Sequence, residues 1–263
     1  MSLSHVKMYY EIHGNGPLVI TMIHGWTESG KFWKEQLPIF DKDKYKIILL
    51  DLKGHGRSSK NMRGYLIRNH SYDVYELLEN LGIKETILFG HSLGGMVTLD
   101  FYFRRPIKVK AICLFNTSSR AMRLPRSLSE LGGIGRFGLR KFFMTVYDFS
   151  PDRVFSHKKE ENVQELIKEA NDPVVTPPRV SIMCGIGAFN FNVEYKLNRI
   201  NIPVLILTGE KDAVTPPRLS YRMQKLIPKS ICHIIPDTGH MAVIEKSDEV
   251  NQIILRFLSK NNL

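Results

Sequence analysis

Short apolar runs of strand length alternate along this chain with segments of helical periodicity. Most runs are rich in β-branched or other large apolar residues and are followed by short turns. The strand-like runs occupy residues 18–23, 45–50, 86–89, 109–115, 204–208 and 231–235. Helical patterns occupy residues 31–40, 72–81, 93–103 and 248–258. Because alternating strands and helices form mostly parallel sheets flanked by helices, the pattern predicts an α/β fold.

The beginning of the chain shows a different pattern. Residues 7–13 alternate between apolar and polar side chains, and Gly14-Asn15-Gly16-Pro17 follows them directly. This turn is typical of a β-hairpin, so the sequence predicts a hairpin at this point.

The alternation also breaks between residues 118 and 195, where no clear strand is present. Gly132-Gly133 and Pro177-Pro178 separate segments that look helical, such as 160–170, and aromatic and methionine side chains are frequent. The strand rhythm then returns. We therefore expect a core domain formed by residues 1–117 and 196–263, with a helical cap inserted at 118–195.

The strongest chemical signal is the segment Gly90-His91-Ser92-Leu93-Gly94-Gly95. It has the form G-x-S-x-G and stands between a predicted strand and a predicted helix. A nucleophilic serine needs such a sharp turn, which lifts its hydroxyl clear of the sheet, and the following helix N-terminus favours negative charge nearby. A plain turn capped by serine is the alternative. The strand–helix context favours Ser92 as a nucleophile.

A serine hydroxyl is a weak nucleophile at neutral pH and needs a general base. Among the nine histidines, His240 is the best placed, because it lies in the loop after the strand-like run 231–235. Ligands of open α/β sheets bind at the carboxyl ends of the strands. His91 adjoins the serine in sequence, and we expect it to brace the turn instead.

The imidazole in turn needs a carboxylate that fixes its tautomer. Asp212 follows the strand-like run 204–208, and it is therefore expected at the same edge of the sheet as Ser92 and His240. Glu210 competes for this role from the same loop. We favour Asp212 because it lies further out on that loop.

A tetrahedral intermediate also needs two N–H donors for its oxyanion. We expect one from the backbone of Leu93, the residue after the proposed nucleophile. The other is expected from the backbone of Trp26, in the segment His24-Gly25-Trp26 directly after the strand-like run 18–23.

Composition and charge limit the other function classes. A hydrophobic fraction of 43% and a charged fraction of 24% are typical of a soluble globular protein. The net charge is +11, but the basic residues are dispersed and not interleaved with stacking aromatics, so we expect no nucleic-acid partner. We see neither a signal peptide nor an apolar run long enough to span a membrane, and we predict a cytoplasmic protein. The three cysteines are widely spaced and predict neither a disulfide framework nor a zinc ribbon.

Together these segments resemble the α/β-hydrolase superfamily over nearly the whole chain. The matching segments are 24–26, 51–58, 90–95, 209–212 and 239–240. The chain looks like the branch of serine esterases and lipases with an inserted helical cap. The resemblance implies a triad of Ser92, Asp212 and His240 with no cofactor and no metal. Relatives that open epoxides carry aspartate at the position that Ser92 occupies here, so Ser92 implies that epoxide opening is not the activity.

The sequence thus predicts a serine hydrolase that cleaves carboxylic esters of small or medium size through an acyl-enzyme. Lactone hydrolysis, carbon–carbon bond hydrolysis and perhydrolysis use a similar triad in chains that resemble this one, and they stay open as alternatives. A third alternative is a small-molecule receptor with an intact triad. The expected partner is a small-molecule ester, and the sequence specifies no oligomeric state.

Overall fold

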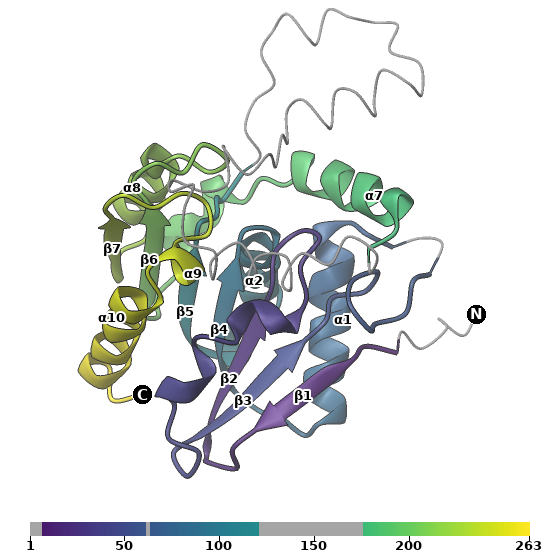
Figure 1. Ribbon diagram of the computed structural model, residues 1–263, viewed down its shortest axis with the longest axis horizontal. Helices are drawn as coiled ribbons and strands as arrows, with labels where there is room; N and C mark the ends of the chain where they lie inside the picture. Colours follow the sequence, from purple (N-terminus) through teal and green to yellow (C-terminus); the bar gives the residue numbers. More distant parts are fainter. Residues whose placement is uncertain (1–6, 62–63, 121–175) are drawn as a thin grey trace, which may run out of the picture.

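One sheet of seven strands lies at the centre of the computed structural model, which describes residues 7–61, 64–120 and 176–263. The strand order is β1-β3-β2-β4-β5-β6-β7, and only the β1–β3 pair is antiparallel. The strands are β1 Tyr10–His13, β2 Leu18–Ile23, β3 Tyr45–Leu50, β4 Thr86–His91, β5 Val109–Phe115, β6 Val204–Gly209 and β7 Ser230–Ile235. The predicted α/β fold is confirmed, and the six parallel strands end at one edge of the sheet (Figure 1).

The predicted hairpin at the first turn is wrong, because β3 lies between β1 and β2. The turn packs instead against the segment that leads into β3. The Asn15 N–H donates to the carbonyl of Lys42 at 2.9 Å, and the Gly16 N–H donates to the carbonyl of Tyr45 at 3.2 Å. Gly14 has a φ of +77°, which glycine adopts without strain. Main-chain bonds to the β3 side therefore carry the chain past β1.

Helices cover both faces of the sheet (Figure 1). The α-helices in the described part are α1 Ile67–Asn80, α2 Leu93–Arg104, α7 Pro178–Phe189, α8 Pro217–Leu226, α9 Ala242–Glu245 and α10 Ser247–Lys260. The short 3-10 helices are η1 Gly30–Trp33, η2 Leu37–Ile39, η3 Pro106–Lys108 and η4 Glu194–Arg199. None of the helices described has the length and apolar character that crossing a membrane requires.

The helix predicted at 31–40 is instead the two 3-10 helices η1 and η2. Pro38 explains the break, because proline lacks the N–H that an α-helix needs and clashes with the carbonyl four residues earlier. The helices predicted at 72–81, 93–103 and 248–258 are present, and the helical segment predicted at 160–170 lies outside the described residues. The one predicted at 72–81 begins earlier, at Ile67.

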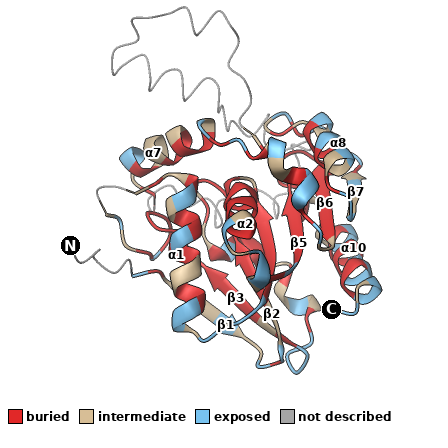
Figure 2. Ribbon diagram, turned by 180° about the vertical axis from the view of Figure 1, so that it is seen from behind, coloured by how far each residue is buried: buried red, intermediate tan, exposed pale blue. Residues whose placement is uncertain are grey.

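Alternate residues of the central strands pack against different helix layers. Leu88 of β4 belongs to the cluster that includes α1 and α2, whereas Phe89 belongs to the cluster that includes α10 and η1. Both side chains are fully buried. Figure 2 shows the central strands of the sheet as almost continuously buried between these layers, whereas the edge strands β1 and β7 are more exposed. Burial on both faces is the reason that the strands read as apolar runs in the sequence.

The two described ends of the predicted cap lie side by side. Arg120 and Asn192 form an isolated antiparallel bridge, and the Val193 N–H donates to the carbonyl of Ser119 at 2.9 Å. Helix α7 packs against α1 near the carboxyl edge of the sheet (Figure 1). The rest of the predicted cap, residues 121–175, lies outside the described residues.

Candidate active site

Ser92 stands on a strained turn between β4 and α2. Its φ of +49° and ψ of −115° are unfavourable for any residue with a side chain, and such strain is typical of functional positions. Two hydrogen bonds from the β5 side hold the turn. The Ser92 N–H donates to the carbonyl of Phe115 at 3.0 Å, and the Thr117 hydroxyl donates to the Ser92 carbonyl at 2.6 Å.

The glycines of the turn allow the close packing that this conformation needs. A Cβ atom on Gly94 would overlap the carbonyl oxygens of Ile23 and His24, at the end of β2. A Cβ atom on Gly90 would overlap the carbonyl of Gly94 and the hydroxyl of Thr98. The backbone of the turn is therefore pressed against β2 and α2, which explains the G-x-S-x-G spacing in steric terms.

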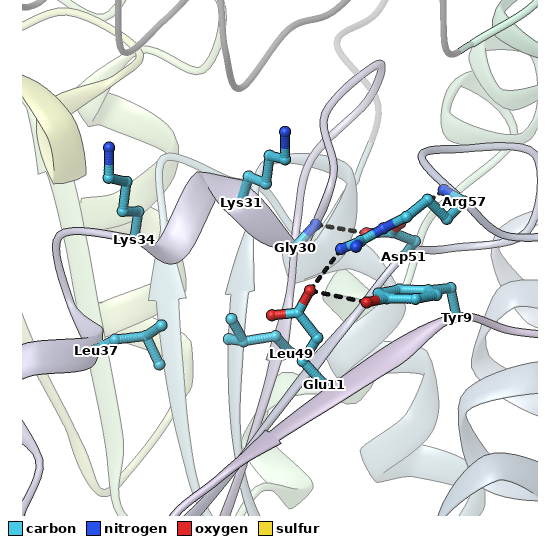
Figure 3. A pocket seen from close by; sticks show the side chains of 9 residues that line it. All are labelled: Tyr9, Glu11, Gly30, Lys31, Lys34, Leu37, Leu49, Asp51 and Arg57. Atoms are coloured by element: carbon cyan, nitrogen blue, oxygen red, sulfur yellow. Dashed lines mark hydrogen bonds and ion pairs between the residues drawn. The ribbon is translucent and has the colours of Figure 1, made fainter.

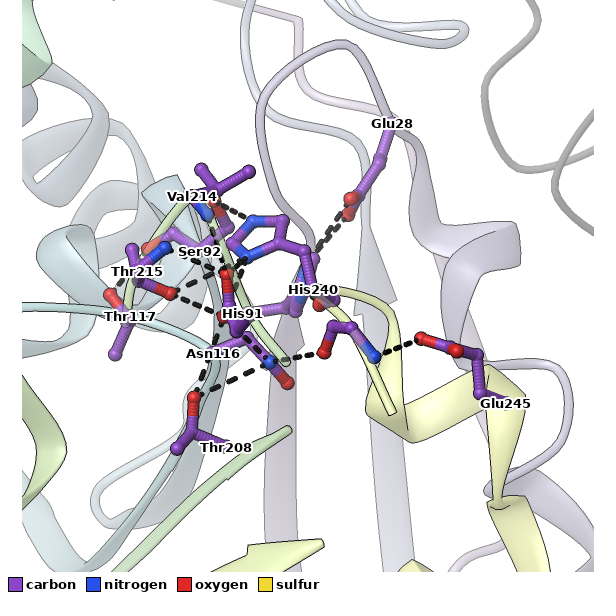
Figure 4. A network of polar contacts seen from close by, with 12 residues as sticks. Glu28, His91, Ser92, Asn116, Thr117, Thr208, Val214, Thr215, His240 and Glu245 are labelled. Atoms are coloured by element: carbon purple, nitrogen blue, oxygen red, sulfur yellow. Dashed lines mark hydrogen bonds and ion pairs between the residues drawn. The ribbon is translucent and has the colours of Figure 1, made fainter. Parts of the chain in front are cut away.

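The structure brings together the three side chains that the sequence nominates (Figure 4). The His240 Nε2 lies 3.0 Å from the Ser92 Oγ. The His240 Nδ1 lies 2.9 Å and 3.1 Å from the two carboxylate oxygens of Asp212. An ionised Asp212 accepts hydrogen bonds and cannot donate, so Nδ1 carries the proton and Nε2 presents its lone pair to the serine hydroxyl. This is the tautomer that a general base needs.

Asp212 is buried and surrounded by donors. The N–H groups of Val214 and Thr215 donate to its Oδ1 at 2.8 Å and 2.7 Å. The Thr215 hydroxyl and the Asn116 amide donate to its Oδ2 at 2.7 Å and 2.9 Å. Burial alone raises the pKa of this carboxyl, but the charge of His240 and these hydrogen bonds outweigh it and lower the pKa to about 2.

The pairing with Asp212 raises the pKa of the His240 imidazole. Burial alone lowers the pKa of His240, but the Asp212 carboxylate outweighs burial, and the pKa is raised above its ordinary value. The residue is 2% exposed, so solvent screens the pair weakly. The carboxylate thus stabilises the imidazolium that forms when His240 accepts a proton.

The competing carboxylate in this loop has a different position. Glu210 is exposed, and its Oε2 accepts a hydrogen bond from the Asp237 N–H at 3.1 Å. Glu245 supports the other side of the site, because its Oε1 accepts a hydrogen bond from the Gly239 N–H at 2.8 Å. Asp212 is the carboxylate that contacts His240, as the sequence favoured.

The segment proposed for the oxyanion is a tight loop after β2. His24 is fully buried and accepts a hydrogen bond from the Leu52 N–H at 2.9 Å through its Nε2, while its Nδ1 donates to the carbonyl of Gly25 at 2.7 Å. Trp26 is buried. Leu93 is the first residue of α2, so its N–H has no carbonyl within the helix to bind. This arrangement is compatible with the roles predicted for the backbones of Trp26 and Leu93, which stay predictions.

Sequence reasoning missed several polar residues that hold the site. Asn116 follows β5 directly, has a φ of +45°, and donates to both Asp212 and the carbonyl of Gly239. Thr117 and Thr215 fix the serine turn and the Asp212 loop, as described above. A polar residue directly after a buried strand is a signal that could have identified Asn116. No comparable pattern identifies Thr215.

A hollow on the described surface lies beside β1 and η1, and no triad residue lines it (Figure 3). Several of its polar groups pair with one another. Arg57 and Tyr9 both donate to Glu11 Oε1, at 2.6 Å and 3.0 Å. Asp51 Oδ1 accepts a hydrogen bond from the Gly30 N–H at 2.7 Å. These pairs tie the 51–58 loop to β1 and η1.

A family model described as the alpha/beta hydrolase fold matches residues 18–247. The chain belongs to the α/β-hydrolase fold family. Residues 18–247 include the whole described sheet except β1, so the match agrees with the sequence resemblance and with the observed topology. The family and its hydrolase relatives identify the protein as a hydrolase.

Named relatives cover several hydrolase activities. The chain is 26% identical over 269 residues to a putative carbamate hydrolase RutD from Stutzerimonas stutzeri, covering 96% of this chain and 97% of that protein. It is 26% identical over 297 residues to mouse bifunctional epoxide hydrolase 2, covering 96% of this chain but 53% of the mouse protein. The chain therefore spans about half the length of the mouse relative.

Solved structures show the same fold. A thermophilic esterase from Thermogutta terrifontis superposes with a TM-score of 0.83 at 24% identity, covering 98% of this chain and 95% of the esterase. Est816, described as an N-acyl homoserine lactone degrading enzyme, superposes with a TM-score of 0.82 at 24% identity, covering 97% of this chain and 98% of that one.

Proposed function

We propose that this hydrolase cleaves carboxylic esters of small or medium size through an acyl-enzyme formed on Ser92. The observation that supports this most strongly is the continuous contact from Ser92 Oγ to His240 Nε2 and from His240 Nδ1 to Asp212. A serine–histidine–carboxylate chain in this tautomer is the arrangement that activates a hydroxyl for attack on a carbonyl.

The reaction proceeds in two acyl-transfer steps. His240 takes the proton of Ser92 as Oγ attacks the carbonyl carbon, and the backbone N–H groups of Leu93 and Trp26 stabilise the oxyanion. His240 then protonates the leaving alcohol as the carbon–oxygen bond breaks. In the second step His240 removes a proton from water, which attacks the acyl carbon. His240 then returns that proton to Ser92 Oγ as the bond between Oγ and the acyl carbon breaks and the acid leaves.

The serine at position 92 favours ester cleavage over the epoxide hydrolysis named for the mouse relative. Epoxide-opening members carry aspartate at that position, whereas this chain carries Ser92. We also propose that residues 118–195 form a cap over the site, which supplies the substrate-facing surface. The convergence of Ser119 and Val193 beside the end of β5 supports an insertion into the core domain.

The first experiment measures hydrolysis of p-nitrophenyl esters of increasing acyl length by the wild-type protein and by Ser92→Ala. The variant is expected to lose activity by about 10⁶-fold while it stays folded, because nucleophile and base act as a unit. Ser220→Ala is the matched control, since it removes the hydroxyl of a serine that lies on α8 and not in the triad. Unchanged turnover in Ser92→Ala, or no turnover of any ester by the folded wild-type protein, would contradict the proposal.

A further inference from the structure

A second buried carboxylate–imidazole pair lies behind the triad, formed by Glu28 and His91. The His91 Nδ1 lies 3.0 Å from Glu28 Oε1 and 3.1 Å from Glu28 Oε2. Glu28 is 4% exposed and His91 is fully buried. Because a buried carboxylate without a partner is costly, this pairing needs an explanation of its own. Figure 4 shows the two side chains beside the His240 loop.

The other bonds of this pair reach both loops that serve the reaction. Glu28 Oε2 accepts a hydrogen bond from the Gly25 N–H at 2.5 Å, within the loop proposed to hold the oxyanion. On the opposite side, the His91 Nε2 lies 3.1 Å from the carbonyl oxygen of His240. One connected unit therefore joins the backbone next to Trp26 to the backbone of the general base.

The hydrogen-bond partners of His91 indicate which of its ring nitrogens carry protons. Nε2 faces a carbonyl, which only accepts, so Nε2 must carry a proton. Nδ1 faces Glu28, which also accepts from the Gly25 N–H; a Glu28 carboxylate that is ionised can only accept, and Nδ1 is then a donor as well. The Phe32 ring stacks on His91 with centroids 4.2 Å apart and planes at 22°, and an aromatic face favours a cation.

The fit around the pair is tight. A Cβ atom on Gly25 would lie 2.8 Å from both Glu28 Oε2 and His91 Nδ1. Thr27, between Gly25 and Glu28, has a φ of +66°, which is strained for a β-branched residue. The loop is held in this conformation at a cost, and the Gly25–Glu28 hydrogen bond is one interaction that offsets it.

We propose that Glu28 and His91 are a positioning pair that fixes the oxyanion loop relative to His240. Glu28 holds His91 in its doubly protonated form, and His91 then donates to the carbonyl of His240 while Glu28 anchors the Gly25 N–H. Neither residue contacts the reacting atoms. The inference deepens the proposed function and rests on it for its kinetic test, but the protonation of His91 is testable without any substrate.

Glu28→Ala removes both anchors and is expected to lower kcat by about 100-fold, the scale of one lost oxyanion donor, with KM changed less than about threefold. The effect falls on kcat because the oxyanion contact exists only in the transition state. Glu28→Gln is the rescue variant. Its amide oxygen can accept from Gly25 and its amide nitrogen can donate to a neutral His91, so it should keep kcat within about tenfold of the wild type.

Glu11→Ala is the matched control, because Glu11 is also an ion-paired glutamate but lies on β1 beside Arg57. Rates are normalised to the fraction of Ser92 that a fluorophosphonate labels, which removes misfolded protein from the comparison. A normal kcat in folded Glu28→Ala would overturn the proposal. So would a Glu28→Gln variant as impaired as Glu28→Ala, since the hydrogen bonds would then not be the cause.

Nitrogen-15 NMR of the histidine rings keeps the proposal testable if a variant fails to fold or if no ester is turned over. In Ser92→Ala protein at neutral pH, His91 should show protons on both ring nitrogens, and in Glu28→Gln on Nε2 alone. A single ring proton on His91 in the Ser92→Ala protein would overturn the assignment. That result is independent of ester hydrolysis, so it is distinguishable from failure of the proposed function.

Discussion

Replacing Asp212 by asparagine tests the proposed triad most sharply, because every polar neighbour of this carboxylate is a donor. Hydrogen bonds from Asn116, Thr208, Val214, Thr215 and His240 converge on its two oxygens. An asparagine in this place has one oxygen and one NH₂ group. The NH₂ group needs an acceptor, and the ring nitrogen that faces residue 212 can serve as one when His240 presents its Nδ1 lone pair.

That change moves the imidazole proton to Nε2, which then faces Ser92 Oγ and cannot accept its proton. We expect Asp212→Asn to lower kcat by about 10⁴-fold, equivalent to about 5 kcal/mol of transition-state stabilisation. The pKa of His240 should also fall, because Asp212 is the main group that raises it. The acidic limb of the kcat/KM profile should therefore move to lower pH.

The assay is the hydrolysis of a p-nitrophenyl ester across pH, with folding checked by circular dichroism. Glu210→Gln is the matched control, since Glu210 lies in the same loop, is exposed and bonds to Asp237 instead. A folded Asp212→Asn protein with kcat within about tenfold of the wild type would refute the tautomer argument, given the magnitude expected for this change.

Three further predictions concern stability. The pKa of Asp212 is lowered to about 2, so its contribution to stability is present above the unfolded pKa and is lost as pH falls through the folded pKa. Between about pH 5 and pH 1 the wild type should therefore lose about 2 kcal/mol more than an Asp212→Asn/His240→Gln double variant, which removes both titrating groups; equal losses in urea titrations would contradict this. Gly94→Ala should destabilise by at least about 1–3 kcal/mol because its Cβ overlaps the carbonyls of Ile23 and His24. The loss should exceed that of Gly30→Ala, whose Cβ would meet no atom closer than 3.4 Å; thermal unfolding compares the two, and a larger loss for Gly30→Ala would count against the steric argument. Lys53→Met should cost about 3–5 kcal/mol of folding free energy, because it leaves the Asp73 carboxylate, 2.8 Å away and 6% exposed, buried without its cation. Lys211→Met removes an exposed ion pair with Asp237 and should cost at most about 1 kcal/mol; similar losses for the two variants in denaturant would disprove the distinction.

Much of the fold was predictable because burial on both faces leaves a continuous apolar signature in a strand. The parallel strands, α2 and α10 follow from that periodicity. Pairing is different, since it depends on contacts between distant segments. The residues after β1 are typical of a β-hairpin turn. The N–H groups of Asn15 and Gly16 nevertheless donate to carbonyls at the start of β3, and β1 pairs with β3.

The nomination of Ser92, Asp212 and His240 also came from the sequence, since each follows a predicted strand and the carboxyl ends of parallel strands share one edge. Sequence order cannot show that His240 Nε2 lies 3.0 Å from Ser92 Oγ, or that Glu210 points elsewhere. It also gave no reason to link Glu28 with His91, which are 63 residues apart. Local sequence patterns reflect the local structure of each segment, such as a sharp turn or a buried face. Partners that meet across the fold are set by packing, so Asn116, Thr215 and the Glu28–His91 pair were decided by the tertiary structure alone.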